Sequence, residues 1–149
     1  MTADWQVVFD ARSPHDLADF WAAALGYQVE QNADLVQQML DAGVAQSSDT
    51  TVHNGVLSWA QLAAICHPDD LAERQRGTGA AHRILFQQVP EGKTVKNRVH
   101  LDINVGPDAM KAEAARLEAL GAAIIAEVSA AGGHWFTMAD PEGNEFDVQ

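Results

Sequence analysis

Hydrophobic and polar residues alternate with two different periods along the chain, and each period predicts one kind of element. Residues 5–11 alternate as a half-buried strand does. Residues 14–25 then place apolar side chains at helical spacing, behind a serine cap and a first-turn proline. Gly26 is expected to end that helix, and residues 27–30 to form a short strand. The chain is therefore predicted to open with a strand, a helix and a strand.

The middle of the chain carries weaker signals. Residues 34–45 have one apolar face and predict an added helix, whereas residues 50–53 predict a weak strand. Residues 59–66 fit a strand or a short helix by period alone. Residues 71–81 mix charges with two glycines, so we expect a flexible connection there.

The second half of the chain repeats this order more clearly. Residues 98–104 alternate polar and apolar side chains, which predicts a strand with one polar face. Gly106, Pro107 and Asp108 are expected to open a helix that runs through Leu120. Three further short runs predict strands: 122–128, 135–138 and 145–148.

The two halves can be aligned with each other. Matching Asp10 with Asp102 gives an offset of 92 residues (102 − 10), and matching Phe86 with Phe146 gives 60 (146 − 86). A proline turn precedes the last strand of each copy. Internal duplication of this kind predicts two similar modules, with a cleft where they face each other.

Composition limits the classes of function. The 149 residues are 47% hydrophobic and 20% charged, which suits one folded domain. The formal net charge of −12 would repel nucleic acid and an anionic membrane surface, and no apolar run is long enough to span a bilayer, so we expect neither partner. The single cysteine, Cys66, lies in an apolar run. Without a signal-peptide pattern, we expect a cytoplasmic protein with a buried, inert thiol.

Several segments together resemble the glyoxalase/bleomycin-resistance group, also called the vicinal oxygen chelate superfamily. They are residues 86–93 leading into 97–102, the Leu-Gly-Ala sequence at 120–122, and residues 135–148 with their Asp-Pro-Glu-Gly-Asn turn. The resemblance covers nearly the whole chain and is loosest over residues 31–82.

The resemblance implies an α+β fold in which two tandem βαβββ modules form a curved mixed sheet around a cleft, with the helices outside. We expect a single glyoxalase-like domain over residues 1–149. Its first module would span residues 1–92, with the inserted helix at about 34–45, and its second module would span residues 93–149.

Enzymes of this group commonly bind a divalent metal through the first and last strands of both modules. Carried over by the resemblance, the second module supplies His100 and Glu145, which suit zinc, nickel, manganese or ferrous iron. The offsets place Val8 opposite His100 and Leu85 opposite Glu145, and neither can bind a metal. Two protein ligands fall short of the usual three or more, so we expect no resident cofactor.

The sequence also allows other roles for His100 and Glu145. His100 and Glu145 could instead hydrogen-bond each other or a ligand. A register shifted by two residues, or histidines from less certain segments, would offer further metal ligands: Gln6, Asp10, Gln87, His53, His67 and His82.

Further side chains are candidate ligand contacts. Arg98 would receive an anionic group, and Asp102 would hold Arg98 or a nearby imidazole, with a structural ion pair as the alternative. Trp59 and Trp135 would stack on a ligand, although core packing is the commoner fate of tryptophan. Lys93 falls between the modules, where it would orient the crossover, meet an anionic ligand, or remain solvated.

We therefore expect a glyoxalase-like protein that binds a small molecule, either sequestering it as bleomycin-resistance proteins do or acting on it without metal. The alternative is a divalent-metal-dependent lyase, isomerase or dioxygenase, in which His100 and Glu145 gain a further ligand. The third hypothesis is that the protein is a non-catalytic interaction module. Members of the group often pair modules across subunits, so a homodimer is expected.

Overall fold

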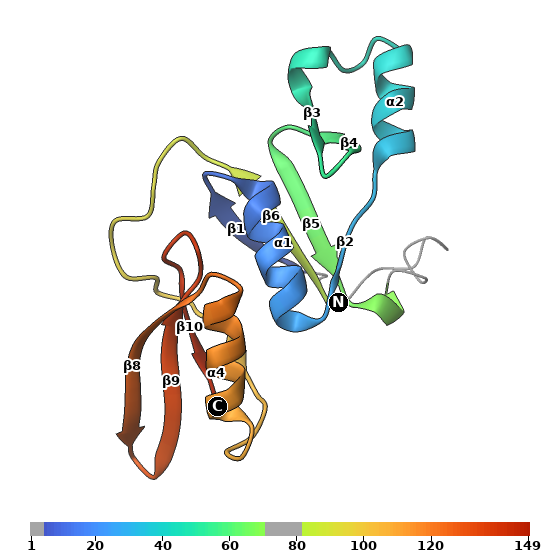
Figure 1. Cartoon of the computed structure of the whole chain (residues 1–149). Coiled ribbons are helices and arrows are strands. Elements are labelled where there is room, and N and C mark those ends of the chain that lie inside the picture. Colours follow the sequence, from blue (N-terminus) through green and yellow to red (C-terminus); the bar gives the residue numbers. More distant parts are fainter. Residues whose placement is uncertain (1–4, 71–81) are drawn as a thin grey trace, which may run out of the picture.

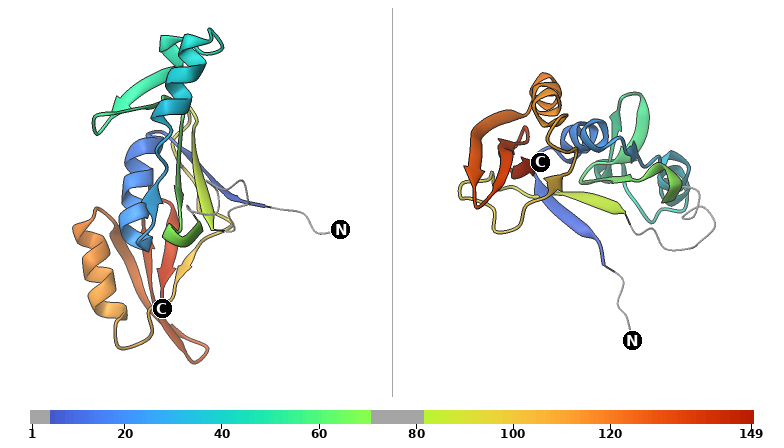
Figure 2. Two further views of the ribbon diagram at one scale, coloured as in Figure 1. Left: turned by 90° about the vertical axis from the view of Figure 1, so that its right-hand side faces the viewer. Right: turned by 90° about the horizontal axis from the view of Figure 1, so that it is seen from below.

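The computed structural model describes residues 5–70 and 82–149 and has the α+β architecture expected from the sequence (Figure 1). Each half of the chain forms a four-stranded sheet. Figure 2 shows that helix α1 (Pro14–Leu25) of the first half and helix α4 (Met110–Ala119) of the second lie on the same side of the two sheets. The connection expected over residues 71–81 lies outside the described residues. Within the described part, no helix is both long and apolar enough to cross a bilayer.

The first module arranges its sheet in the order β1-β6-β5-β2. Strands β1 and β6 are parallel, and the other neighbours are antiparallel. Helix α1 begins at the predicted proline and ends before Gly26, whose φ of 68° is the left-handed conformation that glycine adopts readily. The elements of this module are β1 (Val7–Ala11), α1 (Pro14–Leu25), β2 (Gln28–Val29), β5 (Leu62–Cys66) and β6 (Arg83–Gln88).

The second module has the same strand order, β7-β10-β9-β8, with one parallel and two antiparallel pairs. Asp10 pairs with Gln87 in the first module, and Asp102 pairs with Asp147 in the second. These two pairs match each other under the offsets of 92 and 60 residues, which confirms the predicted duplication of the βαβββ fold. The elements are β7 (Asp102–Ile103), α4 (Met110–Ala119), β8 (Ala123–Ala130), β9 (Gly133–Ala139) and β10 (Glu145–Val148).

An insert between β2 and β5 projects from the first module (Figure 1). It contains the expected helix, which ends at Asp41, and a two-stranded hairpin that the sequence analysis recognised only in part. Asn54 and Gly55 turn the hairpin with φ values of 49° and 80°, as a two-residue hairpin loop requires. The insert consists of α2 (Ala33–Asp41), the short 3-10 helix η1 (Ser47–Asp49), β3 (Thr50–His53) and β4 (Val56–Trp59).

The strand predicted over residues 98–104 is wrong in its first half. Only Asp102 and Ile103 form β7, and residues 89–101, here named the connector, have no regular structure. Val99, expected on an apolar strand face, is 80% exposed. The alternating pattern is present in the sequence, but the Glu145 carboxylate at the start of β10 binds Lys93 and the backbone N–H of Asn97, and these contacts hold the connector out of the sheet.

One hydrophobic core joins the two modules. Trp21 of α1 is fully buried, and its ring lies 5.1 Å from that of Phe146 on β10. Phe20 lies 6.4 Å from the same ring. Because α1 packs against strands of both sheets, the position of one module fixes that of the other.

The second module also completes both ends of α1. The Glu142 carboxylate accepts hydrogen bonds from the backbone N–H groups of Arg12 and Ser13, each at 2.8 Å. At the other end, the Arg116 guanidinium donates to the carbonyl oxygens of Ala23 (3.1 Å) and Ala24 (2.9 Å). An anion at the N-terminus and a cation at the C-terminus both favour the helix dipole and satisfy backbone groups that the helix itself leaves free.

Asp140, at the turn before β10, links these contacts. The residue is 4% exposed. One oxygen accepts the Trp21 indole N–H at 3.0 Å and the Asn144 side-chain amide at 2.8 Å. The other accepts the backbone N–H groups of Glu142 and Asn144, both at 2.9 Å. Four donors compensate the burial of the charge, so the turn that carries Glu142 is fixed against α1.

We predict that Asp140→Ala lowers the free energy of unfolding by about 2–3 kcal/mol, because it leaves several buried donors without acceptors. Urea unfolding followed by circular dichroism measures the change. The matched control is Asp69→Ala, whose side chain is 91% exposed, and we expect an effect within about 0.5 kcal/mol. Equal effects of the two substitutions would contradict the role given to Asp140.

Candidate functional site

A cleft of about 470 Å³ lies at the seam between the modules. Its walls come from β1, the connector, the Asp-Pro-Glu-Gly-Asn turn and the start of β10. Val8, Phe9 and Leu101 give it apolar surface, whereas Lys93 and His100 place polar groups along it. The size of the cleft is that of small-molecule sites, and its lining combines apolar side chains with an unusually large share of polar and charged ones.

His100 lies between two carboxylates. Its Nε2 atom is 3.3 Å from Oδ1 of Asp102 and 3.5 Å from Oδ2 of Asp147. The side chains of His100 and Asp102 are about two-fifths exposed, and that of Asp147 is one-fifth exposed. The three donor atoms lie within 4.8 Å of one another, which makes them a group that could hold a metal ion.

Two neutral donors orient these carboxylates. The Thr137 hydroxyl on β9 donates to Oδ1 of Asp147 at 2.7 Å, and the Gln149 amide donates to Oδ2 of Asp102 at 3.0 Å. Each carboxylate therefore presents its remaining oxygen to the imidazole. This is the arrangement in which outer hydrogen bonds fix the inner groups of a polar site.

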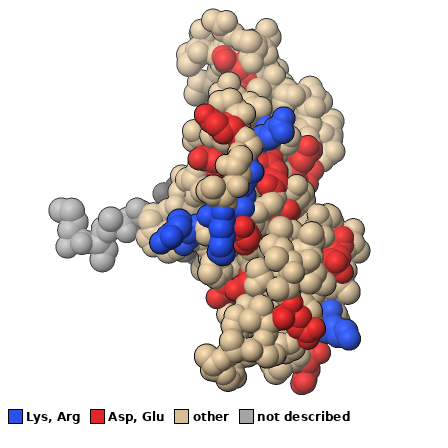
Figure 3. All heavy atoms as spheres, turned by 90° about the vertical axis from the view of Figure 1, so that its left-hand side faces the viewer, with Lys and Arg blue, Asp and Glu red and all other residues tan. Residues whose placement is uncertain are grey.

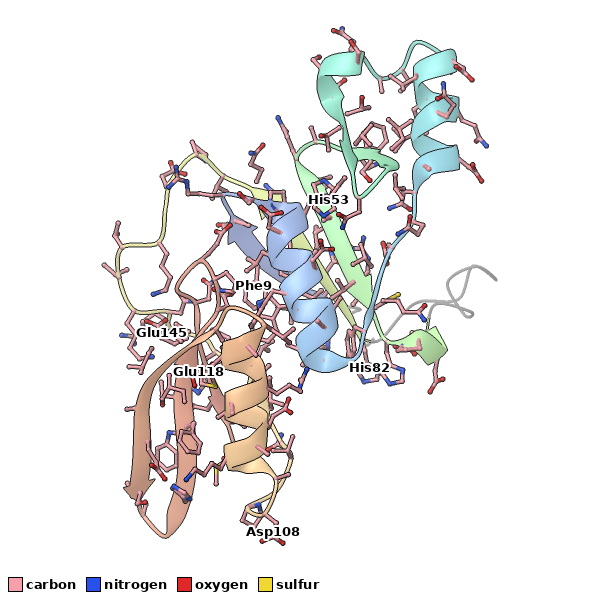
Figure 4. All side chains as sticks on the ribbon, in the orientation of Figure 1. Phe9, His53, His82, Asp108, Glu118 and Glu145 are labelled. Carbon is pink, nitrogen blue, oxygen red and sulfur yellow. The ribbon has the colours of Figure 1, made fainter. Side chains whose placement is uncertain are left out.

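Glu145, labelled in Figure 4, also lines the cleft, but it has partners other than those of His100. Its carboxylate accepts hydrogen bonds from Nζ of Lys93 at 2.9 Å and from the backbone N–H of Asn97 at 3.0 Å. The hydrogen bond from Lys93 is the main cause that lowers the pKa of Glu145 from 4.5 to about 2, and the Asn97 N–H adds to it. Glu145 therefore anchors the connector to β10.

The other predicted contacts are dispersed. Trp59 lines a separate hollow of about 160 Å³ at the junction of α1 and the insert, together with His15 and His53. Trp135 is half-buried on β9 and packs against the core. Arg98 is exposed on the connector. Among the sequence-predicted contacts, the structure brings together only His100 with Asp102, and places Glu145 nearby.

The histidines considered as further metal ligands lie elsewhere. His53 pairs with Asp19 of α1 at 2.7 Å, and His82 pairs with Asp70 at 2.9 Å. Figure 4 shows both well away from Glu145. Cys66 is buried as expected, and burial raises the pKa of its thiol, which disfavours the reactive thiolate.

Asp147 is the neighbour of His100 that the sequence analysis missed. It lies two residues after Glu145 and therefore on the same face of β10. The alignment of the copies contained the signal, because the offset of 60 residues sets Asp147 against Gln87 just as the offset of 92 sets Asp102 against Asp10. The first module thus has Val8, Asp10 and Gln87 where the second has the histidine and two carboxylates.

We predict that the stabilisation from Glu145 is lost in acid. In the unfolded chain its pKa is about 4.5 and in the folded protein about 2, so the stabilisation is fully present above about pH 5 and disappears as the pH falls towards 2. The difference in free energy of unfolding between the wild type and Glu145→Gln should shrink over that range in urea titrations. Glu118→Gln, an exposed carboxylate on α4, is the control. A difference that grows on acidification would refute this assignment.

Comparison with known proteins agrees with this architecture. The family described as "Glyoxalase-like domain" matches residues 6–149. No curated protein resembles the chain closely enough in sequence to count as a relative.

Solved structures share the fold at low sequence identity. A fosfomycin resistance protein from Mesorhizobium loti superposes with a TM-score of 0.61 at 11% identity, covering 100% of this chain and 91% of its own. A possible glyoxalase from Bacillus cereus gives 0.59 at 11%, covering 100% and 99%. A glyoxalase/bleomycin resistance protein/dioxygenase family enzyme from Burkholderia phytofirmans gives 0.57 at 17%, covering 98% and 97%. The duplicated βαβββ topology and the match over nearly the whole length establish that the chain belongs to the glyoxalase-like domain family of the vicinal oxygen chelate superfamily.

Proposed function

We propose that the protein binds a small molecule in the cleft between the modules, to sequester it or to transform it without a metal. The observation that carries this proposal is the cleft itself, about 470 Å³ in volume and lined by apolar side chains beside His100 and Lys93. Similar structures bear the names of resistance proteins and glyoxalases, which is consistent with small-molecule ligands.

The charge of the cleft favours a neutral or positively charged ligand. Four carboxylates line it, those of Asp10, Glu91, Glu142 and Glu145, whereas Lys93 is its one permanently charged cation among the described residues. Figure 3 shows the face that carries the connector, where a small group of Lys and Arg side chains lies among Asp and Glu. With a net charge of −12, the whole chain adds to the attraction for cations. The anionic ligand considered from Arg98 alone has less support.

We predict that Val8→Trp blocks ligand binding by filling the cleft from β1. A fragment library screened by protein-detected NMR should shift the amide signals of Phe9 and Leu101 in the wild type. The dissociation constants fitted to those shifts should be at least about tenfold higher in Val8→Trp, which corresponds to about 1.4 kcal/mol. The matched control is Val52→Trp in the insert, because Val52 is also an exposed strand valine. Fragments that bind both variants equally would rule out this cleft.

A metal-dependent activity is the second candidate, favoured by the group of His100, Asp102 and Asp147. One imidazole nitrogen and two carboxylate oxygens suit manganese, ferrous iron or zinc, and small side-chain movements would bring them to bonding distance. A bound ion would supply Lewis-acid polarisation of a ligand oxygen. His100 and the carboxylates would hold it, with Thr137 and Gln149 orienting the carboxylates.

If the protein binds a metal at this group, we predict that Mn²⁺ at micromolar concentration broadens the NMR signals of residues around Asp102 and Thr137. Asp147→Asn and His100→Ala should each abolish the broadening. His134→Ala is the control, since His134 forms another exposed pair, with Glu127 at 2.9 Å. Broadening that is absent from the wild type, or that persists in both site variants, would exclude a metal at this position.

The homodimer expected from the family remains a proposal. Exposed apolar side chains on the edge strand β8, Ile124 and Ile125, support it, because they supply surface for a second copy. Light scattering on the purified protein decides the matter, and a monomer would refute it.

A further inference from the structure

The connector crosses the cleft with one lysine turned inward. The side chains of Lys93 and Glu145 are only 18% and 15% exposed, although Lys93 as a whole residue, like its neighbours on the connector, is open to solvent. The ammonium group of Lys93 therefore lies inside the site, with its charge held by the Glu145 carboxylate. The wall of the cleft therefore carries a cation that belongs to the chain itself.

This ion pair also coincides with the point where β7 stops. The backbone N–H of Asp147 donates to the Leu101 carbonyl, and that of Gln149 donates to the Ile103 carbonyl. Continuing this parallel ladder by two residues would bring the N–H of Glu145 to the carbonyl of Val99. Instead, the Glu145 carboxylate accepts its own backbone N–H together with the donors of Lys93 and Asn97. The alternating pattern at 98–101 that predicts a strand is thus left unpaired.

We propose that Lys93 stands in for the ammonium group of a ligand. A small organic cation would bind by displacing Lys93 from Glu145, after which the connector pairs with β10 as far as Val99 and closes over the cleft. Glu145 is then the residue that selects a positively charged ligand. This proposal rests on the small-molecule binding proposed above.

Three features of the site support the exchange. The ammonium group of a ligand offers Glu145 the same charge and the same kind of donor as Lys93, so exchanging one for the other leaves the carboxylate paired. Asp10 and Glu91 line the same cleft and add attraction for an incoming cation. Val95 and Val99, which are 75% and 80% exposed, gain burial when the connector closes, and that gain opposes the return of Lys93.

The binding test uses three probes of equal length and different charge: butylammonium, butanol and butyrate. Protein-detected NMR titration should give the tightest binding for butylammonium. Lys93→Met should tighten it by about two- to fivefold, since the competing ion pair is removed. Glu145→Gln should abolish the preference for the cation. Lys96→Met and Glu118→Gln, which make the same changes on the connector surface and on α4, should leave the affinity unchanged.

A second measurement needs no ligand. In Glu145→Gln the carboxylate that captures the connector is gone, so the amide of residue 145 should exchange its hydrogen with solvent at least about tenfold more slowly than in the wild type, as it pairs with Val99. Unchanged or faster exchange would overturn the proposed closure. Weaker butylammonium binding in Lys93→Met, or equal binding of butyrate, would overturn the role of Lys93. If none of the probes binds any variant, the proposed small-molecule function fails as well. The hydrogen exchange of the residue 145 amide then still tests whether the connector can pair with β10.

Discussion

A carboxylate cannot be buried at tolerable cost unless donors surround both of its oxygens, and the module interface is built to meet that condition at Asp140. The donors come from Trp21 on α1 and from the turn that holds Asp140 itself. The same turn places the Glu142 carboxylate against the N–H groups of Arg12 and Ser13, the two residues that precede α1. Asp140 thus stabilises its own turn and fixes α1 of the other module against it. The same turn forms one wall of the cleft. Site and interface share the same residues.

The duplicated fold carries unequal chemistry. Both modules pair their first and last strands in the same register, yet the first module has Val8 and Leu85 at positions where the second has His100 and Glu145. Of those two polar residues, one joins a pair of carboxylates and the other holds the connector. At these two matched pairs of positions the first module therefore supplies apolar side chains and the second supplies polar ones.

Elements governed by local pattern were predictable from the sequence. The start of α1 at a proline, its end at Gly26, and the strands of both sheets follow from side-chain period and backbone preference. The failures have nonlocal causes. The strand expected over 98–104 is shortened because a carboxylate 48 residues away from Asn97 captures that residue's backbone N–H. No periodicity in the connector could reveal such a competitor.

The candidate site was predictable in part for the same reason. His100 and Asp102 lie on one predicted strand face, and the structure keeps them together. The pairing of His100 with Asp147 depends on the register between two strands that are far apart in the sequence. The alignment of the two copies predicts that register, but the resemblance to metal enzymes directed attention to Glu145 instead of Asp147. The partner of Glu145 required knowledge of where an irregular connector runs.

The capping of α1 by Glu142 has a consequence for the order of folding. Arg12 and Ser13 precede Glu142 by 130 and 129 residues, so the N-terminal turn of this early helix depends on a residue that the ribosome adds much later. Contacts of such long sequence separation slow folding, because a large loop must close before they form. During synthesis the first module therefore leaves the ribosome with an unfinished helix and an exposed Trp21 surface. The contacts of α1 with β1, β5 and β6 can form within the first module, but its packing against Phe146 and its caps are completed only when the second module emerges.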